Sequence, residues 1–206
     1  MSDQNIKIFW LIRHAPVLNP DDLCYGQADI PATFDSPAVQ ARLVELAHLL
    51  PDEADWRASR LSRAFLTAVN IAGLRSDNPQ IVEEDAFIEQ SFGDWQTRKR
   101  QADLVHDPDF RNYIKNFASA YPPNGESITD MFNRVSPRLD EIAADPAGAA
   151  DQVIIWHGGP QRVAVAKATD KPIGDCIRGQ KIQYLDGIKI QYDGKNGLWL
   201  PGYERF

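Results

Sequence analysis

Two largely apolar runs, Ile6 to Ile12 and Gln152 to Trp156, constrain the fold of this 206-residue chain more than any other feature. Only Lys7 interrupts the first run. Continuous apolar segments of this length are typical of strands that are buried on both faces, as in a parallel sheet. Stretches with helical spacing lie between and after these runs, so strands and helices alternate along the chain. The sequence therefore predicts an α/β fold, a three-layer α/β/α sandwich with a mostly parallel sheet.

Four helices are expected from their apolar stripes and from the residues that begin or end them, over residues 37–50, 62–74, 127–142 and 160–169. A proline in the first turn opens the first of them. The apolar stripe of the second consists of Phe65, Leu66, Val69 and Ala72. The third begins with a capping pattern at Ser127 and Asp130, and Pro137 is expected to kink it.

The length fits one domain, which we expect to span residues 1–206. A short strand is expected over residues 56–61. Residues 85–125 are rich in aromatic side chains without a clear period, and we interpret them as short helices that form a lid-like insertion. Residues 181–200 alternate around the turn sequences Asp186-Gly187 and Asp193-Gly194, which predicts antiparallel edge strands.

Composition and charge exclude several classes of protein. The formal net charge is −7, whereas a nucleic-acid scaffold normally has a basic footprint. No apolar run approaches the ~20 residues that a membrane-spanning helix needs, and residues 1–5 are polar, unlike a signal peptide. Two cysteines, Cys24 and Cys176, are too few for a disulfide framework, which favours a cytoplasmic location. A homodimer is compatible with the sequence, which does not determine the oligomeric state.

Charged and polar residues follow both buried strands at the point where each strand ends. Arg13-His14 follows the first strand, and His157-Gly158-Gly159 follows the second. Ligands of open α/β sheets bind beyond the carboxyl ends of the strands, so we expect both histidines at one rim. The two glycines would let the backbone approach a ligand, and the next helix would offer free N–H groups to an anion. With Arg63 from the start of the 62–74 helix, this set predicts a site for a tetrahedral oxyanion.

Each of these residues taken alone is more often structural than functional. Their combination at two matching strand ends favours a functional site. His48 in the first helix and His106 in residues 85–125 are expected to be structural. Cys24 is expected to be a small buried residue rather than a nucleophile, because no cationic neighbour is evident in the sequence.

Five groups of residues stand in a defined order along the chain: Arg13-His14; Ser59, Leu61, Arg63, Ala64, Thr67 and Ala68; Glu89, Phe92, Gly93 and Trp95; Gly125-Glu126-Ser127; and His157-Gly158-Gly159. Together they resemble the motifs of the histidine phosphatase (phosphoglycerate mutase-like) superfamily. Three positions depart from the family pattern. Ala15 replaces the usual glycine, Arg60 stands where many members have proline, and Gln96-Thr97 replaces the common Glu-Gly. These departures bear on specificity, since none removes a reacting group.

The resemblance implies a phosphomonoesterase that works through a phosphohistidine. Neutral His14 would attack phosphorus, and Arg13, Arg63 and His157 would hold the equatorial oxygens. Glu89 would protonate the leaving oxygen and then deprotonate the attacking water, unless it is a solvated surface carboxylate. Neither a metal nor another cofactor is expected, since two guanidinium groups supply the positive charge.

The loop Cys24-Tyr25-Gly26-Gln27 resembles the α-ribazole phosphatase branch of this family. It implies a small phosphorylated metabolite as substrate, with α-ribazole 5'-phosphate as one candidate. Tyr25 could stack on a substrate ring and Gln27 could bind a phosphate oxygen, or the loop could only pack against the lid. The short chain favours hydrolysis over a phosphoglycerate mutase. A phospho-ligand-binding protein without turnover is a third hypothesis. A metal-dependent hydrolase is the least favoured, because the close ligand spacing of such sites is missing.

Overall fold

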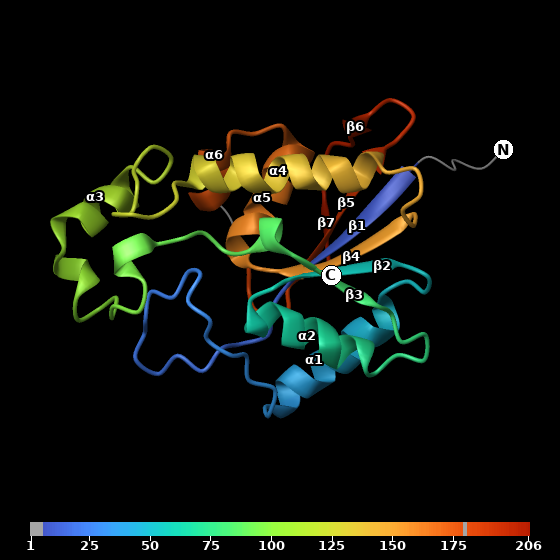
Figure 1. Cartoon of the computed structure of the whole chain (residues 1–206), viewed down its shortest axis with the longest axis horizontal. Helices are drawn as coiled ribbons and strands as arrows, with labels where there is room; N and C mark the ends of the chain where they lie inside the picture. Colours follow the sequence, from blue (N-terminus) through green and yellow to red (C-terminus); the bar gives the residue numbers. More distant parts are fainter. Residues whose placement is uncertain (1–5, 179–180) are drawn as a thin grey trace.

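The computed structural model describes residues 6–178 and 181–206, and its centre is a mixed sheet (Figure 1). Within these ranges the sheet has seven strands in the order β3-β2-β4-β1-β5-β6, with β7 paired to β5. The strands are β1 (Ile6–Arg13), β2 (Asp55–Ser59), β3 (Ile81–Glu84), β4 (Asp151–Trp156), β5 (Gly187–Asp193), β6 (Leu198–Trp199) and β7 (Glu204–Arg205).

The four strands β3, β2, β4 and β1 run parallel to one another, whereas β5 is antiparallel to β1. The register of β1 and β4 places Arg13 opposite Trp156. Both strands therefore end at the same level of the sheet, and the residues that follow them, His14 and His157, leave the sheet side by side.

Helices cover both faces of the sheet, which confirms the predicted three-layer sandwich (Figure 1). One face is covered by α1 (Pro37–Leu49) and α2 (Ser62–Ala72), and the other by α4 (Ile128–Ala144), α5 (Gly158–Thr169) and α6 (Ile173–Arg178). Alternate residues of β4 face opposite layers, because successive side chains of a strand point to opposite faces. Ile154 packs with α4 and α5, and Ile155 packs with α1 and α2.

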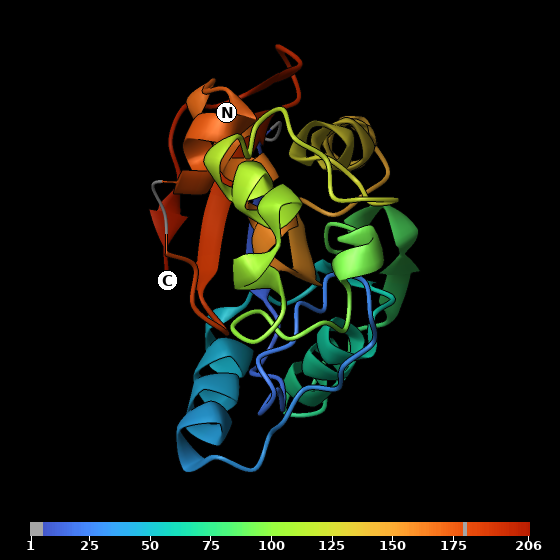
Figure 2. The ribbon, with the colours of Figure 1, turned by 90° about the vertical axis from the view of Figure 1, so that its left-hand side faces the viewer.

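Residues 85–125 contain short helices, as expected: η1 (Asp85–Phe87), η2 (Gly93–Trp95), η3 (Leu104–His106) and α3 (Pro108–Lys115). The last of these lies beyond the end of the strands, on the side that faces the viewer in Figure 2. A small separate core joins Cys24, Trp95, Leu104 and Tyr113. Backbone hydrogen bonds between Cys24 and residues 97–98 tie this segment to the loop after β1. Its role as a lid stays a prediction.

Two local expectations held only in part, and three elements were not predicted. Of the predicted stripe of α2, Ala72 is buried and Phe65 packs against the core, whereas Leu66 and Val69 are 40% and 41% exposed. The rest of the buried face is formed by Arg63, Ala64, Thr67, Ala68 and Ile71. The helix buries small and polar residues because it packs closely on the sheet and directs Arg63 inward, so hydropathy alone located only part of the buried face. Residues 181–186 form no strand, since their backbone bonds to Arg13 and His14 at the end of β1 instead of pairing in a hairpin. The strands β3 and β7 and the helix α6 were not predicted.

The start of α4 confirms the expected capping box. Ser127 Oγ accepts from the Asp130 amide at 3.0 Å, and the Asp130 carboxylate accepts from the Ser127 amide at 3.0 Å. Ser36 caps α1 by its backbone conformation alone, without a side-chain hydrogen bond. No helix in the described ranges has the length and apolar character needed to span a bilayer.

Candidate active site

His14 and His157 meet at the carboxyl ends of β1 and β4, as their strand positions predicted. Their ring centroids are 5.1 Å apart, and both side chains are almost completely buried. The backbone around His14 is fixed from two directions. Its amide donates to Trp156 at 2.9 Å, and the next amide, that of Ala15, donates to Thr67 Oγ1 at 3.0 Å.

The surroundings of His14 favour a neutral imidazole with its free lone pair on Nε2. Nδ1 lies 2.7 Å from the Ala15 carbonyl oxygen, which can only accept, so Nδ1 carries the hydrogen. Burial, Arg63 and Arg13 hold the pKa of His14 well below its ordinary value of 6.5. An unprotonated Nε2 is what a nucleophilic histidine requires.

Arg13 is held in place by the segment before β5. Its Nη1 donates to the Ile182 carbonyl at 2.7 Å, and its guanidinium lies 4.0 Å from the ring centroid of Tyr184. The Tyr184 ring also lies 5.5 Å from that of His14. Sequence reasoning missed Tyr184, because its position two residues before Asp186 carries no motif or periodic signal.

Arg63 enters the site from the first turn of α2 and is fully buried. Its Nη1 and Nη2 donate to the carbonyl oxygens of Ala28 and Gly26, at 2.8 and 2.5 Å. The guanidinium lies 4.9 Å from the ring of Tyr25. Burial lowers the pKa of Arg63, and the carboxylate of Glu89 opposes that effect. These contacts fix a buried positive charge next to the histidines.

His157 is oriented by Ser59 at the end of β2. Ser59 Oγ accepts from the Leu61 amide at 3.4 Å and lies 2.8 Å from His157 Nε2, so its hydrogen can point to that nitrogen. Nδ1 of His157 would then carry a hydrogen that has no partner among the described residues. Burial, Arg63 and His14 hold the pKa of His157 well below 6.5.

Three buried nitrogen atoms of the site have no hydrogen-bond partner within the described residues: Arg13 Nε, Arg63 Nε and His157 Nδ1. Buried donors are almost always paired in folded proteins. A cluster of unpaired donors with two guanidinium charges is therefore suited to bind an oxyanion.

The carboxylate of Glu89 lies against the first turn of α5. Its Oε1 and Oε2 are 3.2 and 3.3 Å from the Gly159 nitrogen, and Oε1 also accepts from the Gln90 amide at 3.0 Å. A Cβ on Gly159 would lie 2.1 Å from Oε1, so only glycine leaves room for the carboxylate in this position.

The sequence predicted that this helix starts near Pro160 and that its first N–H groups are free. The helix in fact begins at Gly158, and the Gly159 N–H already points to a carboxylate. Gly158 borders Arg13, since a Cβ there would lie 3.8 Å from Arg13 Nε.

Tyr25 and Gln27 border the site, each with a defined partner. The Tyr25 hydroxyl lies 3.3 Å from that of Tyr184, and burial raises the pKa of Tyr25 to about 12. For Gln27 the sequence left two readings open, binding of a phosphate oxygen or packing of its loop against the lid. In the structure Gln27 Nε2 donates to the Glu89 carbonyl at 2.9 Å, so the amide supports the backbone that carries the carboxylate, and phosphate binding by Gln27 stays a prediction.

The family departure at Gln96-Thr97 belongs to the same network. Gln96 Oε1 accepts from the Gln27 amide at 2.9 Å and from the Phe92 amide at 3.3 Å. Thr97 takes a φ of +66°, which is unfavourable for a β-branched residue.

A cavity of about 310 Å³ opens next to Arg13, Glu89 and Tyr25. Its remaining walls are mostly aromatic or aliphatic, with Leu23, Cys24, Phe92, Phe110, Tyr113, Ile114 and Phe117, and Arg100 also borders it. Burial raises the pKa of Cys24 to about 11, which fits the expectation that this thiol is not a nucleophile.

Several residues considered from the sequence lie outside this cluster. His48 and His106 are exposed, so His48 does not pack against the apolar stripe of its helix. Arg60 forms an exposed ion pair with Asp85 at 2.8 Å.

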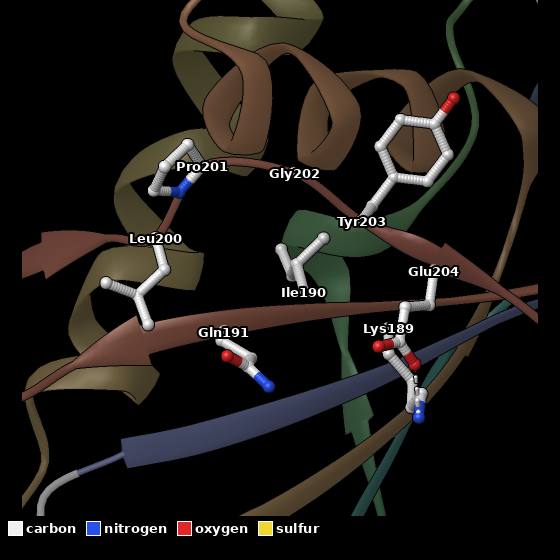
Figure 3. A pocket seen from close by; sticks show the side chains of 8 residues that line it. All are labelled: Lys189, Ile190, Gln191, Leu200, Pro201, Gly202, Tyr203 and Glu204. Carbon is white, nitrogen blue, oxygen red and sulfur yellow. Dashed lines mark ion pairs between the residues drawn. The ribbon is translucent and has the colours of Figure 1, made fainter.

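A second hollow, shown in Figure 3, lies between β5 and the chain that leads into β7. Its charged side chains, Lys189 and Glu204, pair with each other at 2.6 Å, and Lys189 lies over the Trp10 ring. It therefore has no free charged group for a ligand. Over the described ranges, no cluster of three or more His, Cys, Asp or Glu side chains is arranged to hold a metal ion.

The sandwich fold places two buried histidines, with Arg13 and Arg63 nearby, at the carboxyl ends of β1 and β4, where open α/β sheets bind their ligands. The sequence profile of the histidine phosphatase superfamily (branch 1) matches residues 9–198, and the chain belongs to this family. The resemblance drawn from the five motifs is thereby confirmed.

Known proteins share the fold and part of the sequence. The chain is 31% identical over 140 residues to phosphoserine phosphatase 1 of Hydrogenobacter thermophilus, a match that covers 64% of this chain and 62% of the relative. A match at 30% identity to a bifunctional protein of Mycobacterium tuberculosis covers 59% of this chain and only 32% of that protein.

Among solved structures, the α-ribazole phosphatase from Shigella flexneri superposes with a TM-score of 0.79 at 22% identity, covering 95% of this chain and 94% of that one. The mycobacterial glucosyl-3-phosphoglycerate phosphatase gives 0.78 at 20% identity, covering 97% of each chain. At these identities the two structures show that the fold is shared.

Proposed function

We propose that the protein is a phosphatase that hydrolyses a small phosphate monoester through a phosphohistidine on His14. The observation that carries this proposal is the cluster of unpaired buried donors around a neutral histidine with a free Nε2. Family membership and the phosphatase relatives support it.

In the first step, the Nε2 lone pair of His14 attacks phosphorus, and the bond from phosphorus to the alcohol oxygen breaks. Arg13, Arg63 and His157 hold the three equatorial oxygens, on which charge is spread in the transition state. Glu89 donates its proton to the departing alcohol oxygen. In the second step, Glu89 takes a proton from water, the water oxygen attacks phosphorus, and the bond to His14 breaks, which releases phosphate.

The cavity next to Glu89 is proposed to bind the alcohol part of the substrate. Its aromatic walls, which include Phe92, Phe110 and Tyr113, favour a ring or another apolar group in about 310 Å³. The α-ribazole phosphatase that shares the fold makes α-ribazole 5'-phosphate a first substrate to assay.

Trapping the intermediate tests the reaction. After a brief reaction with labelled substrate and a denaturing quench, phosphate should be bound to His14 and be labile to acid and stable to base. His14→Ala should retain no label and should lose about 10³-fold or more of the turnover, as expected for a covalent group. Full activity of His14→Ala would refute the proposal, and tight phosphate binding without turnover in the wild type would favour a binding protein.

Leaving-group dependence tests the role of Glu89. An alkyl alcohol needs a proton in the transition state, whereas nitrophenolate leaves readily without one. Glu89→Gln should therefore cost about 10²–10⁴-fold on an alkyl phosphate and much less on nitrophenyl phosphate. An equal loss on both substrates would assign Glu89 to binding or structure.

A further inference from the structure

The short irregular segment that carries Glu89 takes its hydrogen bonds from a side chain of α4. Arg134 Nη1 donates to the carbonyl oxygens of Ala86 and Ile88, at 2.7 and 3.1 Å, and Nη2 lies 3.5 Å from the Glu89 carbonyl. Backbone carbonyl groups outside helices and sheets must find other partners when they are buried. Here the guanidinium of Arg134 lies against three such carbonyl groups, those of Ala86, Ile88 and Glu89.

Glu126 holds both Arg134 and the other side of the same segment. Its carboxylate receives Arg134 Nε and Nη2 at 2.9 and 2.8 Å, a bidentate pair with both side chains largely buried. The same carboxylate accepts from the Ser91 amide at 3.2 Å. The Glu126 backbone amide donates to the Ser91 carbonyl at 2.9 Å, and its carbonyl accepts from Gln90 Nε2 at 2.6 Å. Residues 86–91 are therefore bound on both sides of Glu89.

We propose that the ion pair of Arg134 and Glu126 positions Glu89 for proton transfer. Neither residue lines the cavity next to Glu89, and both bond to the backbone of residues 86–91, which sets where the Glu89 carboxylate meets Gly159. The charge of Arg134 also contributes to the lowered pKa of His157, and a lysine at position 134 keeps that charge. An arginine is required because its planar fork of five N–H donors serves a carboxylate and three carbonyl groups together, whereas a lysine has one nitrogen. This inference rests on the proposed phosphatase function.

One turn further along α4, a second pair provides a matched control. Arg138 forms a bidentate pair with Glu84, at 2.6 and 3.0 Å, and also contacts Glu141 at 2.9 Å. Glu84 ends β3, five residues before Glu89, and has no contact with the reacting groups. Arg138→Lys thus breaks the same kind of pair in the same helix without touching residues 86–91.

The test compares Arg134→Lys with Arg138→Lys on an alkyl phosphate and on nitrophenyl phosphate. Displacement of a catalytic group by about 1 Å costs on the order of 10²-fold. Arg134→Lys should lower kcat for the alkyl phosphate by about 10–10²-fold and leave kcat and KM for nitrophenyl phosphate within about threefold. Arg138→Lys should change kcat for both substrates by the same factor, even if its melting temperature falls as much as that of Arg134→Lys. If Arg134→Lys does not fold, Glu126→Gln replaces it, with the same selective loss expected.

The double variant Glu89→Gln with Arg134→Lys decides whether the two residues act together. If Arg134 works through Glu89, the double variant should be no slower on the alkyl phosphate than Glu89→Gln alone. If Glu89→Gln keeps its selective loss, two results would overturn the positioning role. One is a double variant whose loss of kcat is the product of the two single losses, and the other is an equal loss on both substrates in Arg134→Lys. If Glu89→Gln itself showed no dependence on the leaving group, the proton-donor role and this inference would both fall. A wild type that forms no phosphohistidine would refute the proposed function instead.

Discussion

Gly159→Ala should displace the proton donor without removing it. The new Cβ would lie 2.1 Å from Glu89 Oε1 and 2.8 Å from Met131 Sδ, whereas real Cβ contacts are essentially never shorter than 3.0 Å. The carboxylate must therefore retreat by about 1 Å, a displacement that costs on the order of 10²-fold in rate, or about 2.7 kcal/mol of transition-state stabilisation. Both obstructing groups are ends of flexible side chains, so the fold can accommodate the change. Alanine also favours a helix by about 1 kcal/mol over glycine.

The assay is kcat on an alkyl phosphate and on nitrophenyl phosphate, with the melting temperature measured in parallel. We expect a loss of about 10²-fold on the alkyl phosphate, a much smaller loss on nitrophenyl phosphate and an unchanged or higher melting temperature. Gly158→Ala is the matched comparison. Its Cβ would approach Arg162 and Arg13, at 3.2 and 3.8 Å, and would not meet Glu89, so any loss should be equal on both substrates. Full activity of Gly159→Ala on the alkyl phosphate would refute the assignment of the carboxylate to this position.

Four further outcomes are expected. Vanadate should inhibit about 10²-fold or more tightly than phosphate, because it mimics the transition state, and EDTA should not reduce activity; loss on chelation with recovery on adding a divalent ion would indicate a metallohydrolase. Release of free phosphate should exceed exchange between 2- and 3-phosphoglycerate, and faster exchange would favour a mutase. Stability should fall as the pH drops below about 6.5, by at most about 1.4 kcal/mol per pH unit for each buried histidine, since the folded-state pKa values of His14 and His157 lie well below 6.5 and the unfolded chain binds more protons there. Chemical denaturation at several pH values below 6.5 should show that the free energy of unfolding depends less steeply on pH in His14→Ala than in the wild type. Thr97→Gly should raise the free energy of unfolding by about 1 kcal/mol, because it relieves a positive φ at an exposed residue; a decrease would show that the threonine side chain contributes more than the strain costs.

Some of the fold could be predicted because it depends on local patterns. The runs that became β1 and β4 are mostly apolar, with Lys7 and Gln152 as polar exceptions, and such runs are typical of strands buried on both faces. The capping box of α4 involves groups three residues apart, so its residues identify it. The buried face of α2 was predicted only in part, because it depends on what the helix packs against and not on a local pattern. Hydropathy reports what a residue prefers, and α2 instead buries Arg63 and Thr67 while it leaves Leu66 and Val69 exposed.

The sequence by itself determined that two histidines follow parallel buried strands, and hence that they meet at one rim of the sheet. It also contained the order of motifs that identifies the family. Only the tertiary structure decided what surrounds them. Glu89 meets the Gly159 amide across 70 residues of chain, and Arg13 meets the Ile182 carbonyl across 169. No periodicity encodes such contacts, because they depend on how β1, β4 and the segments at their ends pack in space. The state of His14 has a similar origin, since burial and the distant Arg63, together with the adjacent Arg13, keep its imidazole neutral.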